Sequence, residues 1–224
     1  HIMKDRQTLD HITSSVLTGA GEYFDTVHPD AVLVHGDTTT TFAAGLAAFY
    51  RKIPVGHVEA GLRSGDMYLP FPEEMNRVLT DRITAWSFAP TELAKENLLR
   101  EGTLKENVIV TGNTVIDALF YTVAKTSKPN IPEFNKLPDG APFLLVTAHR
   151  RESWGAPLEE ICSALTELLD SHPKLWMIIP MHKNPAVREI IKKHLADRQQ
   201  VILCDPLDYP DFVWAMNSSQ FILS

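Results

Sequence analysis

The regular alternation of short apolar segments with amphipathic ones is the feature that most restricts how this chain can fold. Helical patterns separate short apolar runs, which lie at 31–37, 53–61, 86–89, 108–110, 143–146, 175–182, 201–206 and 221–224. Strand, helix and strand in this order are typical of parallel β-sheets whose strands are joined by right-handed helical crossovers. The sequence therefore predicts the α/β fold class.

A segment rich in proline interrupts this alternation near the middle of the chain. Residues 127–142 contain Pro129, Pro132, Pro138 and Pro142, a composition that is typical of linkers and surface loops. We therefore predict two Rossmann-like domains, at 1–111 and 112–224, with the linker at the start of the second. Each series of strands is short, and the chain opens on a helical pattern and closes on a bare apolar strand, so we expect a part of a longer protein that lacks both ends.

Composition excludes several functional classes. The formal net charge of -7 argues against nucleic acid as the main partner, although a local group of arginines and histidines can still bind an anionic small ligand. Cys162 and Cys204 form neither a metal-ligand pair nor a disulfide framework, which is typical of a reducing, cytoplasmic location. No apolar run approaches the roughly 20 residues of a membrane span, so we expect no membrane partner.

Ionisable residues follow several of the predicted strands directly. In open α/β folds the ligand binds beyond the carboxyl ends of the strands, so we expect these side chains to meet in one cleft between the domains. A simpler reading of Asp37 with Thr38 is that they cap the next helix. The residues at the strand ends are His35, Asp37, His57, Glu59, Arg63, His149, Arg150, Glu152, His182 and Asp205.

The segment PFPEEMNR at 70–77 forms a second polar cluster. Pro72 and the acidic residues after it are good chemistry for a helix start without any function. Glu73 and Arg77 are four residues apart and share a helix face, so they form either a surface ion pair or a pair that points into the cleft. HExxH, GxSxG, GxGxxG and P-loop patterns are absent, so no zinc, serine nucleophile, nicotinamide cofactor or ATP is predicted.

A set of motifs in a fixed order resembles a known family. The motifs are HGDTTTT, GHVEAGLRSGD, PFPEEMNR, TGNTVIDAL, TAHRRESWG and PMHKNP. Together they resemble the non-hydrolysing bacterial UDP-N-acetylglucosamine 2-epimerases over essentially the whole chain. The resemblance implies a fold of the GT-B type, with each Rossmann-like domain incomplete here. It also implies a UDP-sugar substrate, a homodimer and no cofactor or metal.

The resemblance further implies a reaction and the residues for it. UDP-GlcNAc and UDP-ManNAc interconvert by removal of the C2 proton, elimination of UDP and re-addition of UDP. The matching catalytic residues are Asp37, Glu59, Glu73 and His149, and which carboxylate is the base and which the acid stays open. Candidate substrate-binding residues are His35, Arg63, Arg77, Asn113, Arg150, Glu152 and His182. In several members a second UDP-GlcNAc acts as an activator, and the matching residues are Arg6, Glu73, Arg150 and His182.

Three other functions remain open at this point. A GT-B glycosyltransferase would share the fold and the UDP-sugar donor, a hydrolysing epimerase would release free ManNAc, and a binding module would need none of the carboxylates. Because both ends are expected to be missing, we expect the 224-residue chain by itself to be inactive.

Overall fold

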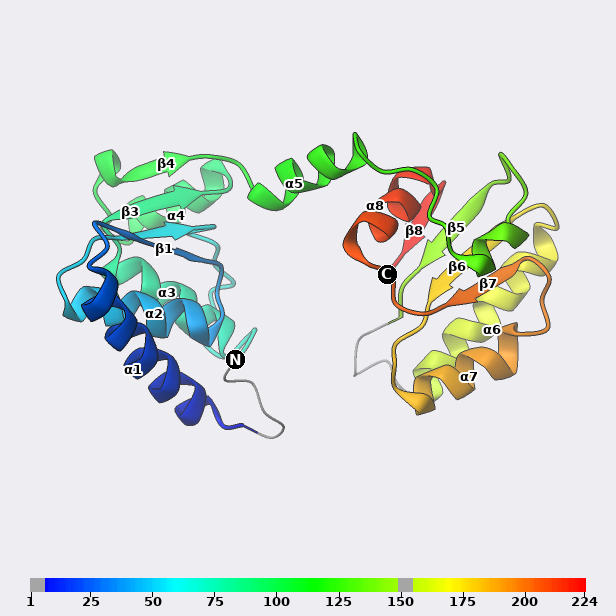
Figure 1. Ribbon diagram of the computed structural model, residues 1–224, viewed down its shortest axis with the longest axis horizontal. Helices are drawn as coiled ribbons and strands as arrows, with labels where there is room; N and C mark the ends of the chain where they lie inside the picture. The colour runs from blue at the N-terminus through cyan, green and yellow to red at the C-terminus, as the bar shows by residue number, and fades with distance from the viewer. Residues whose placement is uncertain (1–6, 149–154) are drawn as a thin grey trace. The chain divides into compact units, whose positions relative to one another are not determined.

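The computed structural model describes residues 7–148 and 155–224, which form two compact units. The first unit ends at Thr114 and the second begins at Val115, three residues after the boundary expected from the sequence. Each unit contains one parallel four-stranded sheet with helices packed on it, so the predicted α/β class is confirmed (Figure 1). No helix in these two stretches has the length and apolar character that crossing a membrane requires.

The first unit alternates helices and strands as the sequence predicts. Its sheet has the order β1-β2-β3-β4, and Val34 on β1 lies beside His57 on β2. The elements are α1 (Leu9–Val27), β1 (Val32–His35), α2 (Thr39–Tyr50), β2 (Val55–Val58), α3 (Glu73–Ile83), β3 (Trp86–Ala89), α4 (Glu92–Arg100), a 3-10 turn (Lys105–Asn107) and β4 (Val108–Val110).

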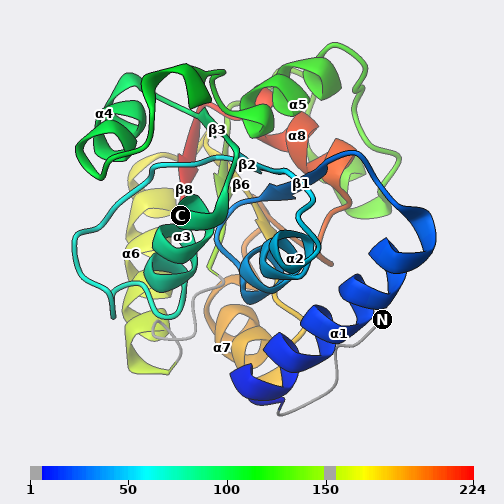
Figure 2. The ribbon, with the colours of Figure 1, turned by 90° about the vertical axis from the view of Figure 1, so that its left-hand side faces the viewer.

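Local chemistry explains where these helices start and what they bury. Thr8, Thr38 and Thr91 are the N-caps of α1, α2 and α4, and each side chain accepts a hydrogen bond from a backbone N–H in the first turn. Thr38, and not Asp37, is therefore the cap of α2. Helix α2 lies between α1 and α3 on one side of the sheet, and its small residues Ala47 and Ala48 allow close packing (Figures 1 and 2).

The second unit has the strand order of a Rossmann half. Its sheet runs β7-β6-β5-β8. The first strand in the sequence, β5, therefore lies in the interior, with β6 on one side and the fourth strand, β8, on the other. The order of strand connection reverses between β5 and β8, which is where such folds bind ligands. The elements are α5 (Thr114–Val123), a 3-10 turn (Pro132–Lys136), β5 (Phe143–Val146), α6 (Ala156–Ser171), β6 (Trp176–Pro180), α7 (Pro185–Leu195), β7 (Val201–Cys204), α8 (Tyr209–Ser218) and β8 (Phe221–Leu223).

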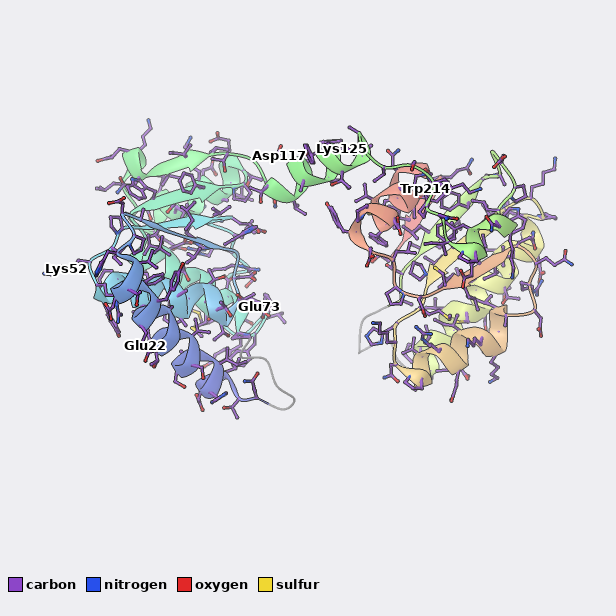
Figure 3. All side chains as sticks on the ribbon, viewed as in Figure 1. Glu22, Lys52, Glu73, Asp117, Lys125 and Trp214 are labelled. Carbon is purple, nitrogen blue, oxygen red and sulfur yellow. The ribbon has the colours of Figure 1, made fainter. Side chains whose placement is uncertain are left out.

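Strand β5 is apolar throughout because both faces of its sheet are covered. Leu144 and Val146 pack in the cluster formed with α6 and α7. Phe143 and Leu145 face the opposite cluster, which includes α8. There Trp214 stacks on Phe143 with ring centroids 6.0 Å apart, which anchors α8 to the sheet (Figure 3).

Candidate active site

The turn after β1 presents Asp37 at the carboxyl edge of the first sheet. The N–H of Gly36 donates to the Val58 carbonyl at 3.0 Å, and the Thr41 hydroxyl donates to the His35 carbonyl at 2.6 Å. Gly36 has φ 76°, a conformation that glycine adopts without strain. The turn is therefore held by a backbone hydrogen bond and by the Thr41 hydroxyl, independently of the Asp37 side chain.

The carboxylate of Asp37 is held on one oxygen only. Arg77 donates to Oδ2 from Nε at 3.0 Å and from Nη2 at 2.7 Å. Asn76 donates from Nδ2 to the backbone carbonyl of Asp37 at 2.9 Å. Within the described residues nothing hydrogen-bonds to Oδ1, and the side chain of Asp37 is 30% exposed. The geometry thus leaves one oxygen of an oriented carboxylate accessible for accepting or donating a proton.

Arg77 pairs with Glu74 and Asp37, so the interpretation of Glu73 and Arg77 as a surface ion pair is wrong. Glu74 is buried, and its Oε1 accepts the N–H groups of Ser64 at 2.9 Å and Gly65 at 3.1 Å. Burial acts to raise the pKa of Glu74, but the Gly65 N–H, the Arg77 guanidinium and the Ser64 N–H together hold it below its ordinary value. The i,i+3 partner was missed because residues three and four apart share nearly the same helix face.

Glu59 and His35 form a second polar pair at this edge. His35 Nε2 lies 3.2 Å from Glu59 Oε2, and the His35 side chain is more than half exposed. Glu59 has φ 71°, which is unfavourable for a residue with a side chain. Its N–H donates to the Phe88 carbonyl at 3.0 Å, which helps to hold this strained conformation. The Glu59 side chain thus meets His35 at the carboxyl end of β1.

Glu73 begins α3 and is half-buried. Figure 3 shows Glu73 on the side of the first unit toward which the strands point, whereas Lys52, which precedes β2, lies at the opposite end. The three predicted carboxylates Asp37, Glu59 and Glu73 therefore belong to the same edge of one sheet. Such an edge is the usual place for a ligand in α/β proteins.

Arg63 is engaged by protein groups on every nitrogen of its guanidinium. Nη2 donates to Asp81 at 2.7 Å and to Glu101 at 2.9 Å, Nε donates to Glu101 at 2.8 Å, and Nη1 donates to the Leu62 carbonyl at 2.7 Å. Burial acts to lower the pKa of Arg63, but Glu101 and Asp81 raise it above its ordinary value. Its role in this unit is to join the loop after β2 to α3 and α4.

In the second unit, the side chain of Arg188 holds the loop after β6. Arg188 donates from Nε to the His182 carbonyl at 3.0 Å and from Nη2 to Asp205 at 2.7 Å. The ring of His182 accepts the Asn184 N–H on Nδ1 at 3.1 Å, so the hydrogen of a neutral ring is on Nε2. His182 is exposed.

The structure gives less information on the other site residues predicted from the sequence. Asn113 lies in the loop between β4 and α5, where the chain leaves the first sheet. Arg6, His149, Arg150 and Glu152 lie outside the described residues; in the sequence, His149 follows β5, the strand at the reversal point of the second sheet. Across residues 7–148 and 155–224, no group of three His, Cys, Asp or Glu side chains is arranged to hold a metal ion.

Comparisons with known proteins identify relatives of this chain. A family model described as UDP-N-acetylglucosamine 2-epimerase matches residues 1–224. A UDP-N-acetylglucosamine 2-epimerase of Bacillus subtilis is 48% identical over 225 residues, which cover all of this chain and 58% of that protein. The structure of Staphylococcus aureus MnaA with UDP is 50% identical, with a TM-score of 0.87, and the match covers 97% of this chain and 59% of that one.

A second solved structure extends the comparison. The UDP-GlcNAc 2-epimerase of Neisseria meningitidis bound to UDP-GlcNAc is 46% identical, with a TM-score of 0.85, and the match covers 99% of this chain and 61% of that one. The fold and the polar sheet edges thus define a protein of the GT-B class, built from Rossmann-like units. Within that class, the chain belongs to the UDP-N-acetylglucosamine 2-epimerase family. It spans about three fifths of the length of the curated relatives that it matches.

Sequence reasoning missed the buried polar residues that support Asp37. These residues, Glu74, Asn76 and Asp81, all come from α3. His57, which the sequence predicts in the cleft, is instead fully buried within β2. The sequence does contain one signal for these buried residues. The polar residues of α3 are spaced so that they lie on more than one face of the helix. A helix that only covers a core has a single polar face, turned toward solvent.

Proposed function

We propose that the protein containing this chain is a non-hydrolysing epimerase that interconverts UDP-GlcNAc and UDP-ManNAc. The observation that carries the proposal is the Asp37 carboxylate, which Arg77 fixes through Oδ2 while Oδ1 stays accessible at the carboxyl edge of the sheet. Family membership supports the UDP-sugar substrate, because relatives of this chain have been solved with UDP and with UDP-GlcNAc.

The proposed reaction needs proton transfer on both faces of C2. One carboxylate removes the C2 proton, and the C1–O bond to UDP breaks with its electron pair leaving on UDP, which gives 2-acetamidoglucal. UDP then adds back at C1 while C2 takes a proton on the opposite face. Asp37, Glu59 and Glu73 supply the groups at this edge, and an oriented carboxylate within hydrogen-bond reach is what such a step requires.

Positive charge and hydrogen-bond donors are needed where UDP departs. We assign this to His149 and Arg150, which follow β5 in the sequence, and to His182 after β6. His35, Arg63, Arg77, Asn113 and Glu152 are further substrate-binding candidates. His182 supports its part of this assignment, since its ring is oriented by the Asn184 N–H and its loop by Arg188.

The decisive experiment supplies UDP-GlcNAc alone in deuterated water, without an acceptor sugar or an added metal. We expect UDP-ManNAc to form with deuterium at C2. Formation of free ManNAc would instead show a hydrolysing epimerase, and turnover only after an acceptor is added would show a glycosyltransferase. Product without deuterium at C2 would contradict the proton-transfer mechanism.

Matched substitutions test the carboxylate. Asp37→Asn should lower the rate by roughly 10²–10⁴, as is typical of general acid–base groups. Asp25→Asn is the control, because Asp25 on α1 is also paired with an arginine, Arg51, which directly follows α2. Equal rates for the two variants would exclude a catalytic role for Asp37.

Two further parts of the proposal concern assembly and activation. The protein is proposed to be a homodimer, which light scattering of the purified protein tests directly. A second UDP-GlcNAc is proposed to activate the enzyme through Arg6, Glu73, Arg150 and His182. If so, the initial rate should depend sigmoidally on UDP-GlcNAc concentration, and a hyperbolic dependence would contradict activation.

A further inference from the structure

A histidine lies fully buried in the middle strand of the first unit. His57 is 0% exposed, and its strand β2 is hydrogen-bonded to β1 on one side and β3 on the other. Its Nε2 lies 2.8 Å from the Gly36 carbonyl, and its Nδ1 lies 2.5 Å from Asp81 Oδ1. The ring therefore links α3 to the turn that carries Asp37.

The partners of the ring determine the direction of both hydrogen bonds. A carbonyl oxygen only accepts, so Nε2 donates to Gly36. Asp81 Oδ2 accepts the Gly61 N–H at 3.2 Å and Arg63 Nη2 at 2.7 Å, which is the bonding of an ionised carboxylate. Its Oδ1 therefore also accepts, and Nδ1 of His57 is the donor. His57 thus bridges two acceptors that belong to different elements.

The Gly36 carbonyl belongs to the same peptide group as the Asp37 N–H. A hydrogen bond to this oxygen fixes the plane of that peptide group and with it the direction in which the Asp37 side chain leaves the backbone. Asn76 holds the next carbonyl and Arg77 holds the carboxylate. Without the contact from His57, the bond that orients the Gly36 carbonyl would be lost.

We propose that His57 and Asp81 are positioning residues that orient Asp37 through the Gly36 carbonyl. The proposal rests on the proposed function, in which Asp37 transfers a proton. Neither residue reaches the open edge itself, since both side chains are at most 2% exposed. Their effect on the reaction is therefore transmitted through the turn.

Two substitutions at one position separate positioning from simple packing. The amide nitrogen of glutamine reaches about as far as Nε2 of histidine, and that of asparagine about as far as Nδ1. His57→Gln should therefore keep the donor to Gly36 and lose the donor to Asp81, while His57→Asn should do the reverse. We expect His57→Asn to lower kcat roughly a hundredfold with little change in KM, and His57→Gln to lower it far less.

The second readout does not depend on activity. Because the Gly36 carbonyl and the Asp37 N–H share a peptide group, the amide ¹⁵N resonance of Asp37 in the 224-residue chain should shift in His57→Asn and stay near its original position in His57→Gln. Asp25→Asn serves as the control and should leave the resonance unchanged. If His57→Asn does not fold, Asp81→Asn replaces it, with an expected loss of kcat of at least about tenfold and a shift of the same resonance.

The outcomes separate this proposal from the proposed function. If the two His57 variants lose kcat equally, or lose it in proportion to their melting temperatures, the positioning role is overturned. An unshifted Asp37 resonance in His57→Asn, or in Asp81→Asn where that variant is used, also overturns it. If the unsubstituted protein shows no deuterium at C2, the proposed function fails, while the resonance of Asp37 still decides whether His57 orients the turn.

Discussion

Replacing Glu74 by glutamine should destabilise the first unit strongly, although the change is nearly isosteric. Glu74 Oε1 accepts two backbone N–H groups, and Oε2 accepts Arg77 Nη1 at 2.9 Å. In Glu74→Gln the amide oxygen can still accept the two N–H groups, but its NH₂ group then faces the Arg77 guanidinium, donor against donor. Loss of one charge-assisted hydrogen bond in a buried site lowers the free energy of unfolding by about 1.5–3 kcal/mol.

The chain offers a closely matched control in Glu92→Gln. Glu92 also lies in the first turn of its helix and pairs with a cation three residues later, Lys95, at 3.0 Å. Its side chain is 70% exposed, however, against 3% for Glu74. An exposed pair of this kind contributes about 0.5 kcal/mol or less, so Glu92→Gln should be nearly neutral.

Fluorine NMR can assign the loss to the correct unit. Trp86 is the only tryptophan in residues 1–114 of the sequence, so 5-fluorotryptophan labelling gives a urea transition for the first unit from one resonance. Trp176 and Trp214 report on the second unit in the same sample. We expect the midpoint of Trp86 to fall in Glu74→Gln and to stay in place in Glu92→Gln. Equal midpoints for the two variants would show that the contacts of Glu74 do not stabilise the unit.

Three further predictions follow from other contacts. The pKa of Glu74 is lowered in the folded state, so its contribution to the free energy of unfolding is present above the unfolded-state pKa of about 4.3 and is lost as the pH falls through the folded-state pKa. The difference in the free energy of unfolding between wild type and Glu74→Gln should therefore disappear below about pH 4, as urea titrations would show. Gly61 and Gly65 both have φ 84°, but a Cβ on Gly61 would lie 2.3 Å from the Ala94 carbonyl, whereas one on Gly65 would meet nothing. Gly61→Ala should therefore lower the free energy of unfolding by about 1–3 kcal/mol more than Gly65→Ala, and equal losses would contradict this. Burial, with Glu133 and Asp205, raises the pKa of Cys204 to about 12, so its thiol should resist iodoacetamide at pH 8 until urea unfolds the chain, as mass spectrometry of the alkylated protein would show.

Most of the fold follows from sequence periodicity because each element has a simple apolar pattern. The FLLV run predicts a strand covered on both faces, and β5 is buried at all four positions. The interpretation of Thr38 as a helix cap is confirmed, since Thr38 is the N-cap of α2. Strand order was beyond this reasoning, since the periodicity of β5 and β8 contains nothing that says the two are neighbours.

The candidate site was only partly predictable for a related reason. Residues that follow strands directly, such as Asp37 and Glu59, were found because parallel strands bring their carboxyl ends to one edge. The ion pair of Glu73 with Arg77, one of the two readings left open, is wrong, because the choice between Glu73 and Glu74 depends on the rotation of α3 relative to the sheet. Asp81 was missed because nothing in the sequence shows that it meets a histidine 24 residues earlier.

Helix α3 has a composition that only the site explains. Four of its polar residues are buried, whereas a helix that merely covers a core would bury apolar residues at those positions. They are Glu74, Asn76, Thr80 and Asp81.

The contacts of α3 reach both turns at the edge of the first sheet. Glu74 holds the loop at Ser64, Asn76 holds the carbonyl of Asp37, and Asp81 holds Gly61. Burying polar groups lowers stability unless every one of them finds a partner, so an apolar face would have been the simpler way to attach this helix. What the polar face adds is orientation, because hydrogen bonds fix directions that apolar packing leaves adjustable. Parallel strands bring Asp37 and Glu59 to one edge, and helix α3 is best understood as the element that fixes the turn after β1 relative to the turn after β2.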